Sequence, residues 1–138
     1  MRRARLGDAA QQLMEARMKV DQAASRESFA RKDGASLAII DQYGYVSQRL
    51  AMAEAKLEVA QMDGVPEQVR LDIITDAMSK VYDAQRSLRH PGGSDYRTAL
   101  HDEVIDIVDS AVLPNIEAAT ATLTAQRDVS FRIVGPGG

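Results

Sequence analysis

The chain has 138 residues, of which 45% are hydrophobic and 27% charged, and its formal net charge at pH 7 is −3. This composition is typical of one globular domain and excludes a disordered chain. The absence of cysteine excludes a disulfide framework, a thiolate metal site and a cysteine nucleophile.

The charges are unevenly distributed along the chain. Residues 1–33 hold eight Lys or Arg against five Asp or Glu, which gives +3, so the remainder sums to −6. This gradient is too mild for a nucleic-acid-binding domain, and we expect none. An uninterrupted apolar run of about 18 residues is missing, and no apolar signal follows the basic start, so we expect a cytoplasmic chain without a membrane span.

Gly and Pro divide the sequence into helices. Asp8 can cap a first helix, which Asp33-Gly34 breaks, and Asp63-Gly64 ends a second helix. Pro66 then opens a third at a favoured first-turn position. The helices that we predict are 8–32, 35–62, 66–89, 95–113 and 115–126.

The fourth and fifth of these helices meet at Pro114. A proline inside a helix removes one backbone hydrogen bond and clashes with the preceding turn, so Pro114 either kinks one helix or separates two. We slightly favour the kink, because no Gly or Ser cluster stands between the segments. The fold class is therefore all-α, a bundle of four to five helices.

The C-terminal segment has a different pattern. Residues 129–134 alternate apolar and polar types with period two, and residues 135–138 are Gly-Pro-Gly-Gly. This alternation predicts one short strand, with an ordered coil packed on the bundle as the alternative. We thus expect a bundle domain at 1–127 and an extended arm at 128–138, whose Phe131, Ile133 and Val134 dock on a neighbouring subunit or another protein.

The second helix carries two apolar stripes. One stripe, from Ile39 to Ala60, is spaced alternately by four and three residues, which is the pattern of a core seam. Tyr45, Met52, Val59 and Met62 lie on nearly the opposite face. Either this helix is central in a monomer, or its second face is an interface between copies of the chain; we favour self-association.

Three acids in the predicted fourth helix suggest an alternative chemistry. Asp102, Asp106 and Asp109 share one helix face and could bind Mg²⁺ if Glu54 and Glu58 faced them, as in helical hydrolases. An acidic stripe opposite an apolar one is also what a solvated helix shows, and we favour that interpretation. We therefore expect no metal and no cofactor.

Two segments carry a family resemblance. The run Leu13 to Val20, the run Gly64 to Arg70, and Gln85 together resemble the all-helical chorismate mutases. The resemblance implies an intertwined helical dimer with a site around Arg17, Arg49 and Gln85. Ser28 stands where the resemblance places a substrate-binding Lys.

The function that we predict is a non-enzymatic helical assembly or adaptor protein. A homo-oligomer would form through the second helix, and the C-terminal arm would contact a neighbour. Phage head-to-tail connector components combine a small bundle with a terminal arm, and the comparison is by architecture. A chorismate-mutase-like enzyme and a Mg²⁺-dependent hydrolase are the alternatives.

Overall fold

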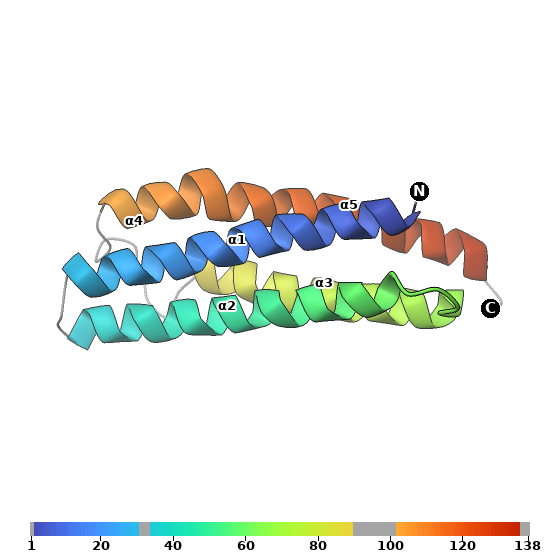
Figure 1. Ribbon diagram of the computed structural model, residues 1–138, viewed down its shortest axis with the longest axis horizontal. Helices are drawn as coiled ribbons and strands as arrows, with labels where there is room; N and C mark the ends of the chain where they lie inside the picture. Colours follow the sequence, from blue (N-terminus) through green and yellow to red (C-terminus); the bar gives the residue numbers. More distant parts are fainter. Residues whose placement is uncertain (1, 31–33, 90–101, 136–138) are drawn as a thin grey trace.

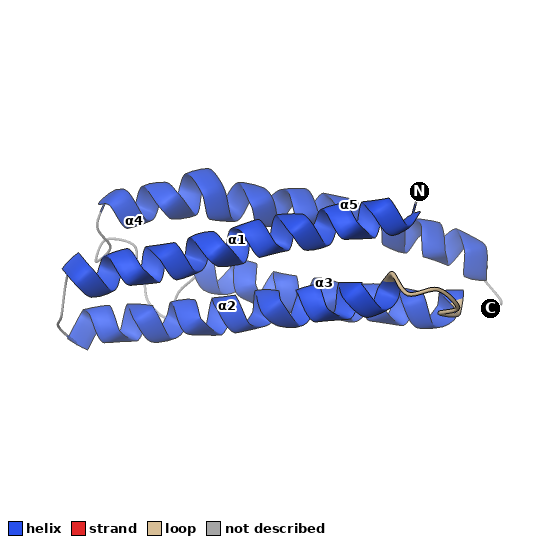
Figure 2. Ribbon diagram, viewed as in Figure 1, coloured by secondary structure: helices blue, strands red, loops and turns tan. Residues whose placement is uncertain are grey.

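The computed structural model describes residues 2–30, 34–89 and 102–135, and it is a helical bundle (Figure 1). Apart from the turn at 61–66 and Gly135, every described residue is helical, so the predicted all-α class is confirmed (Figure 2). The elements are α1 (Arg2–Ala30), α2 (Gly34–Ala60), α3 (Glu67–Arg89), α4 (Asp102–Ile107), the π-helical turn η2 (Val108–Val112) and α5 (Leu113–Val134).

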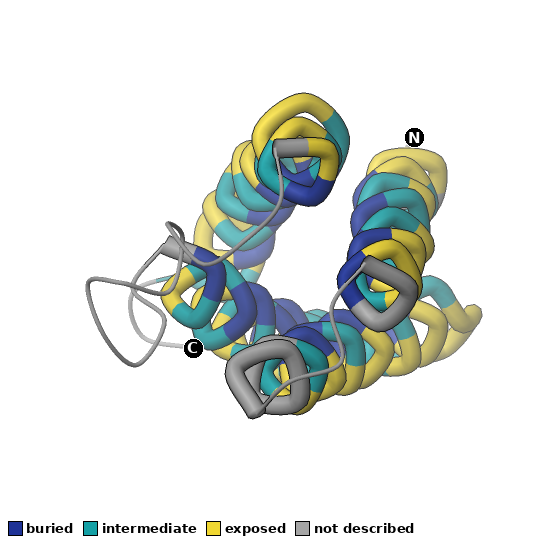
Figure 3. Tube along the Cα trace, turned by 90° about the vertical axis from the view of Figure 1, so that its left-hand side faces the viewer, coloured by how far each residue is buried: buried dark blue, intermediate teal, exposed yellow. Residues whose placement is uncertain are grey.

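The helices form a four-membered ring. α2 packs between α1 and α3, and α5 packs between α3 and α1, which closes the ring; the end view in Figure 3 shows the buried sides turned inward. Successive helices run in opposite directions (Figure 1). This is the up-and-down arrangement that four helices adopt when each has one apolar stripe to bury.

The core is built from a three-and-four spacing of buried residues. Large aliphatic residues alternate with alanine along each stripe, which lets the helices approach closely and interlock. Tyr43 is the largest fully buried side chain. The stripes are Leu6, Ala9, Leu13, Ala16, Val20 and Ala23 on α1; Tyr43, Val46, Leu50, Ala53, Leu57 and Ala60 on α2; and Ile74, Ala77, Val81, Ala84 and Leu88 on α3.

The connection between α2 and α3 follows the predicted break. Gly64 has φ of 81°, a left-handed conformation that glycine adopts without steric cost. Glu67 then begins α3 and places a carboxylate at the positive end of its dipole.

Pro114 does not separate two helices. α4, η2 and α5 follow one another without a break, so our division into helices at 95–113 and 115–126 is wrong for the described part; residues 95–101 lie outside it. The Leu113 N–H donates to the carbonyl of Val108, five residues back, and the side-chain amide of Asn115 donates to Ala111 O at 2.6 Å. The wider turn accommodates the proline within a continuous helix.

The π-helical turn also keeps the core stripe aligned. The buried residues Val104, Val108, Val112 and Ile116 are spaced by four each time, not alternately by three and four. In a regular α-helix this spacing would turn the stripe away from the core by about 40° at each step. The extra residue that the π turn takes up corrects this rotation.

The predicted strand at 129–134 is wrong, because α5 continues through Val134. Extending an existing helix adds a backbone hydrogen bond for each residue, whereas a lone strand leaves its backbone groups unpaired. The helix ends at Gly135, whose φ is 79° and whose N–H donates to Phe131 O at 2.9 Å. Residues 136–138 of the predicted arm lie outside the described residues.

Candidate interaction surface

The outer face of α2 and the turn that follows it expose large apolar side chains. Tyr45 and Met52 are each 37% exposed, Val59 is 43% exposed and Met62 is 55% exposed. Tyr45, Met52 and Val59 follow one another at seven-residue intervals, so they form one stripe along the helix. The inner stripe of the same helix is fully buried, so the core is complete without these four residues, which we call the outer α2 surface.

Arg49 lies against this surface. Its guanidinium carbon is 4.9 Å from the centroid of the Tyr45 ring, and its Nη1 is 4.0 Å from Met52 Sδ. The first contact is a cation–π interaction and the second a weak hydrogen bond to a thioether. Arg49 Nε is buried without a hydrogen-bond partner. The arginine therefore contacts both Tyr45 and Met52 of the surface.

Gly44 is adjacent to Tyr45 and is exposed in the middle of α2. A Cβ atom placed on Gly44 would meet nothing within 4 Å. Glycine in a helix interior costs about 0.5–1 kcal/mol relative to alanine, and nothing within the described chain compensates for this cost.

Among the described side chains of α1 and α3, the exposed apolar ones do not form such a stripe. Met18 is on α1, whereas Val69 and Tyr82 are thirteen residues apart on α3. Scattered residues of this kind are normal on a protein surface.

The C-terminal end of α5 carries the other predicted interface residues. Phe131 and Ile133 are 57% and 58% exposed, and Val134 is half-buried. Figure 1 shows that the end of α5 extends past the start of α1. The three residues thus lie on a helix end, some distance along the molecule from Tyr45.

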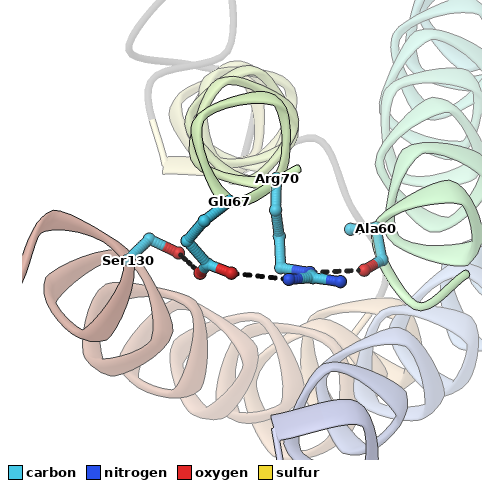
Figure 4. A network of polar contacts seen from close by, with 4 residues as sticks. All are labelled: Ala60, Glu67, Arg70 and Ser130. Atoms are coloured by element: carbon cyan, nitrogen blue, oxygen red, sulfur yellow. Dashed lines mark hydrogen bonds and ion pairs between the residues drawn. The ribbon is translucent and has the colours of Figure 1, made fainter. Parts of the chain in front are cut away.

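A polar network joins three helix ends beneath this segment (Figure 4). Ser130 Oγ donates to Glu67 Oε1 at 2.8 Å, and Arg70 Nη1 donates to Glu67 Oε2 at 2.6 Å. Arg70 Nε also donates to Ala60 O at 2.9 Å, which satisfies a carbonyl at the end of α2. We did not predict this network from the sequence, where its signal was polar residues that continue the apolar spacing of α3 and α5.

Two of the residues implied by the chorismate mutase resemblance, Arg17 and Arg49, are not brought together. Arg17 donates to Glu54 from Nε at 2.6 Å and from Nη2 at 3.2 Å, so its guanidinium lies between α1 and α2. The hydrogen bond from Arg17 to Glu54 raises the pKa of Arg17 above its ordinary value. Lys56 pairs with Asp76 of α3 and therefore lies on the side of α2 that faces α3. Arg49 is seven residues before Lys56, so it lies on that same side, away from the side of α2 that Arg17 contacts.

The described acids that were considered for a Mg²⁺ site are likewise not grouped together. Asp106 and Asp109 are exposed, Glu58 is exposed on α2, and Glu54 is engaged by Arg17. The side chain of Asp102 lies outside the described residues. Within the described residues, no three His, Cys, Asp or Glu side chains are grouped so that they could hold a metal ion.

Comparisons with known proteins found no matching family model, no matching curated protein and no matching solved structure. No helix in the described part of the chain is long and apolar enough to cross a membrane.

Proposed function

We propose that this protein is a non-enzymatic helical assembly or adaptor protein that forms a homo-oligomer through the outer α2 surface. The observation that carries the proposal is the stripe of Tyr45, Met52 and Val59, exposed at heptad spacing beside a complete core. Fully burying an exposed side chain of this kind contributes roughly 1.5–3 kcal/mol, and because these three are 37–43% exposed in the monomer, each would contribute on the order of 1 kcal/mol to association.

A second copy of the chain suits this surface. A heptad stripe suits a long helix opposite it, and α2 itself is a helix of 27 residues. Two copies related by a two-fold axis would bury the same stripe on both sides and close the assembly. Gly44 supports a close helix contact here, because an exposed glycine that the monomer does not need lets another backbone approach.

The proposal assigns the C-terminal end of α5 a second contact, with a neighbouring subunit or another protein. Phe131 and Ile133 would supply the apolar part of that contact as residues of a helix end. This replaces the extended arm that the sequence pattern suggested.

Charged substitutions on the outer α2 surface test the proposal. The double variant Met52→Glu with Val59→Glu should have the 15.0 kDa mass of one chain by light scattering, whereas the unmodified protein should have a multiple of it. Buried carboxylates at the interface would lack partners, which disfavours association strongly. The matched control is Met18→Glu with Tyr82→Glu, which replaces apolar residues on α1 and α3 that are more exposed than Met52 and Val59, and this variant should associate normally.

A double variant that associates as the unmodified protein does would contradict the assignment of the surface. Circular dichroism of both double variants should show the unmodified helix content, because all four positions are exposed in the monomer.

A further inference from the structure

The inward stripe of α5 changes character after Leu123. Ile116, Ala119 and Leu123 are fully buried, but the next two buried residues on the stripe are Gln126 and Ser130. No apolar side chain of α5 after Leu123 is fully buried. Hydrophobic burial, which holds the rest of the helix in the bundle, therefore contributes less to the last two turns, where Val129 and Val134 are only partly buried.

The contact from Ser130 to Glu67 lies at the end of the polar network. If Ser130 moves away, Glu67 keeps its ion pair with Arg70 at 2.6 Å, and Arg70 keeps its hydrogen bond to Ala60 O. Departure of the α5 end thus leaves no buried charge unpaired, which would otherwise be the main penalty for opening.

Nearby apolar residues oppose the movement only weakly, because Val129 and Val134 are partly and not fully buried. Phe131 and Ile133 are already more than half exposed while the helix end is closed. Opening therefore exposes less than half of the surface of each of these two side chains.

We propose that residues 127–134 form a latch, a helix end that detaches from the bundle and unwinds as a unit while the remainder of the bundle stays folded. The hydrogen bond between Ser130 and Glu67 holds the latch closed. The open state releases Phe131 and Ile133 from their fixed position without unfolding the core. This device is independent of association through the outer α2 surface.

Amide hydrogen exchange of the full chain, followed by mass spectrometry, tests the latch. Amides of 127–134 should exchange as one group and at least ~100-fold faster than amides of 116–123, because they open without global unfolding. In the Ser130→Ala variant the latch amides should exchange about 10-fold faster still, the effect of losing one hydrogen bond to a charged group. Protection of α2 and α3 should not change.

Thr124→Ala is the matched control, because the Thr124 hydroxyl donates to Thr120 O within α5 at 2.8 Å and not to another helix. This variant should leave exchange of the latch unchanged. The proposal is overturned if 127–134 exchanges at the rate of 116–123, or if Ser130→Ala accelerates exchange equally in all four helices. It is also overturned if Ser130→Ala and Thr124→Ala have the same effect on the latch.

Discussion

Arg17 and Glu54 join α1 to α2 by two hydrogen bonds, of 2.6 and 3.2 Å, and both side chains are less than one-third exposed. A bidentate, partly buried pair is stronger than an exposed one, since geometry fixes both groups and water screens them less. We predict a coupling of about 1 kcal/mol in a double-mutant cycle of Arg17→Met and Glu54→Gln, measured by urea unfolding.

The pair of Arg26 and Glu103 is the control for this cycle. Its 3.4 Å contact also joins two helices, but the side chains are 53% and 62% exposed. We expect a coupling near zero there, about 0–0.5 kcal/mol. Equal couplings in the two cycles would show that burial and geometry do not strengthen the pair of Arg17 and Glu54.

Asp76 makes stability depend on pH. The hydrogen bond from Lys56 at 2.6 Å, together with the charges of Lys56 and Lys80, holds the pKa of Asp76 below its ordinary value despite some opposing desolvation. A lowered folded-state pKa adds stability that is present above the unfolded value, near pH 3.9, and is lost as the pH falls through the folded value. Asp76→Asn should therefore destabilise the protein at pH 7.

The size of this effect is limited by solvent, because the Asp76 side chain is 45% exposed. After this discount we expect a loss of about 0.5 kcal/mol at pH 7, and none once the pH is below the folded pKa of Asp76. Urea unfolding of the variant and of the unmodified protein, at pH 7 and at a pH below the folded pKa of Asp76, measures this difference in unfolding free energy. Asp72→Asn is the control, because that carboxylate accepts a hydrogen bond from neutral Gln68, and this variant should destabilise the protein less at pH 7. A loss that persists unchanged in acid would contradict the ion-pair explanation.

The π-helical turn before Pro114 contains one residue more than a regular α-helical turn. We predict that deleting the exposed Ser110 in a Pro114→Ala background gives a regular α-helix with its core stripe intact. The alanine background is needed because proline inside a regular helix costs about 3 kcal/mol. The unfolding free energy should stay within about 2 kcal/mol of the background, as cooperative thermal unfolding would show. Loss of the cooperative transition would show that the extra residue has another role.

Gly44→Ala should stabilise the monomer by about 0.5–1 kcal/mol, because alanine favours the helix and the added Cβ meets nothing within 4 Å. The measurement is best made by urea unfolding in the Met52→Glu and Val59→Glu background, where we expect no association. Gly7→Ala is the control, since a Cβ there would lie 3.3 Å from Gln61 Oε1 and the gain should be smaller. A destabilised Gly44→Ala monomer would contradict the open surroundings of this residue.

Local signals in the sequence predicted most of the fold. The breaks at Gly64 and Pro66 and the two-faced pattern of α2 follow from backbone chemistry and side-chain spacing, and the helix bounds agree within a few residues for α2 and α3. The first helix begins at Arg2 and not at Asp8. Asp8 is a favourable N-cap residue that is also tolerated inside a helix, and the burial of Leu6 in the core stabilises the longer helix.

The errors arose where tertiary packing overrides a local pattern. The alternation of residues 129–134 suits a strand, yet a helix places Ser130 toward Glu67 and leaves Phe131 outward. The π-helical turn has no local signature besides Pro114, because it depends on how four inward valine and isoleucine residues meet the core. The polar network required knowledge of which helix ends lie together.

The mass of the unmodified protein in solution tests the central claim most directly. Sedimentation equilibrium over a range of concentrations should give a defined multiple of 15.0 kDa, with dissociation only on dilution. A mass of 15.0 kDa at all concentrations up to the millimolar range would contradict self-association through Tyr45, Met52, Val59 and Met62.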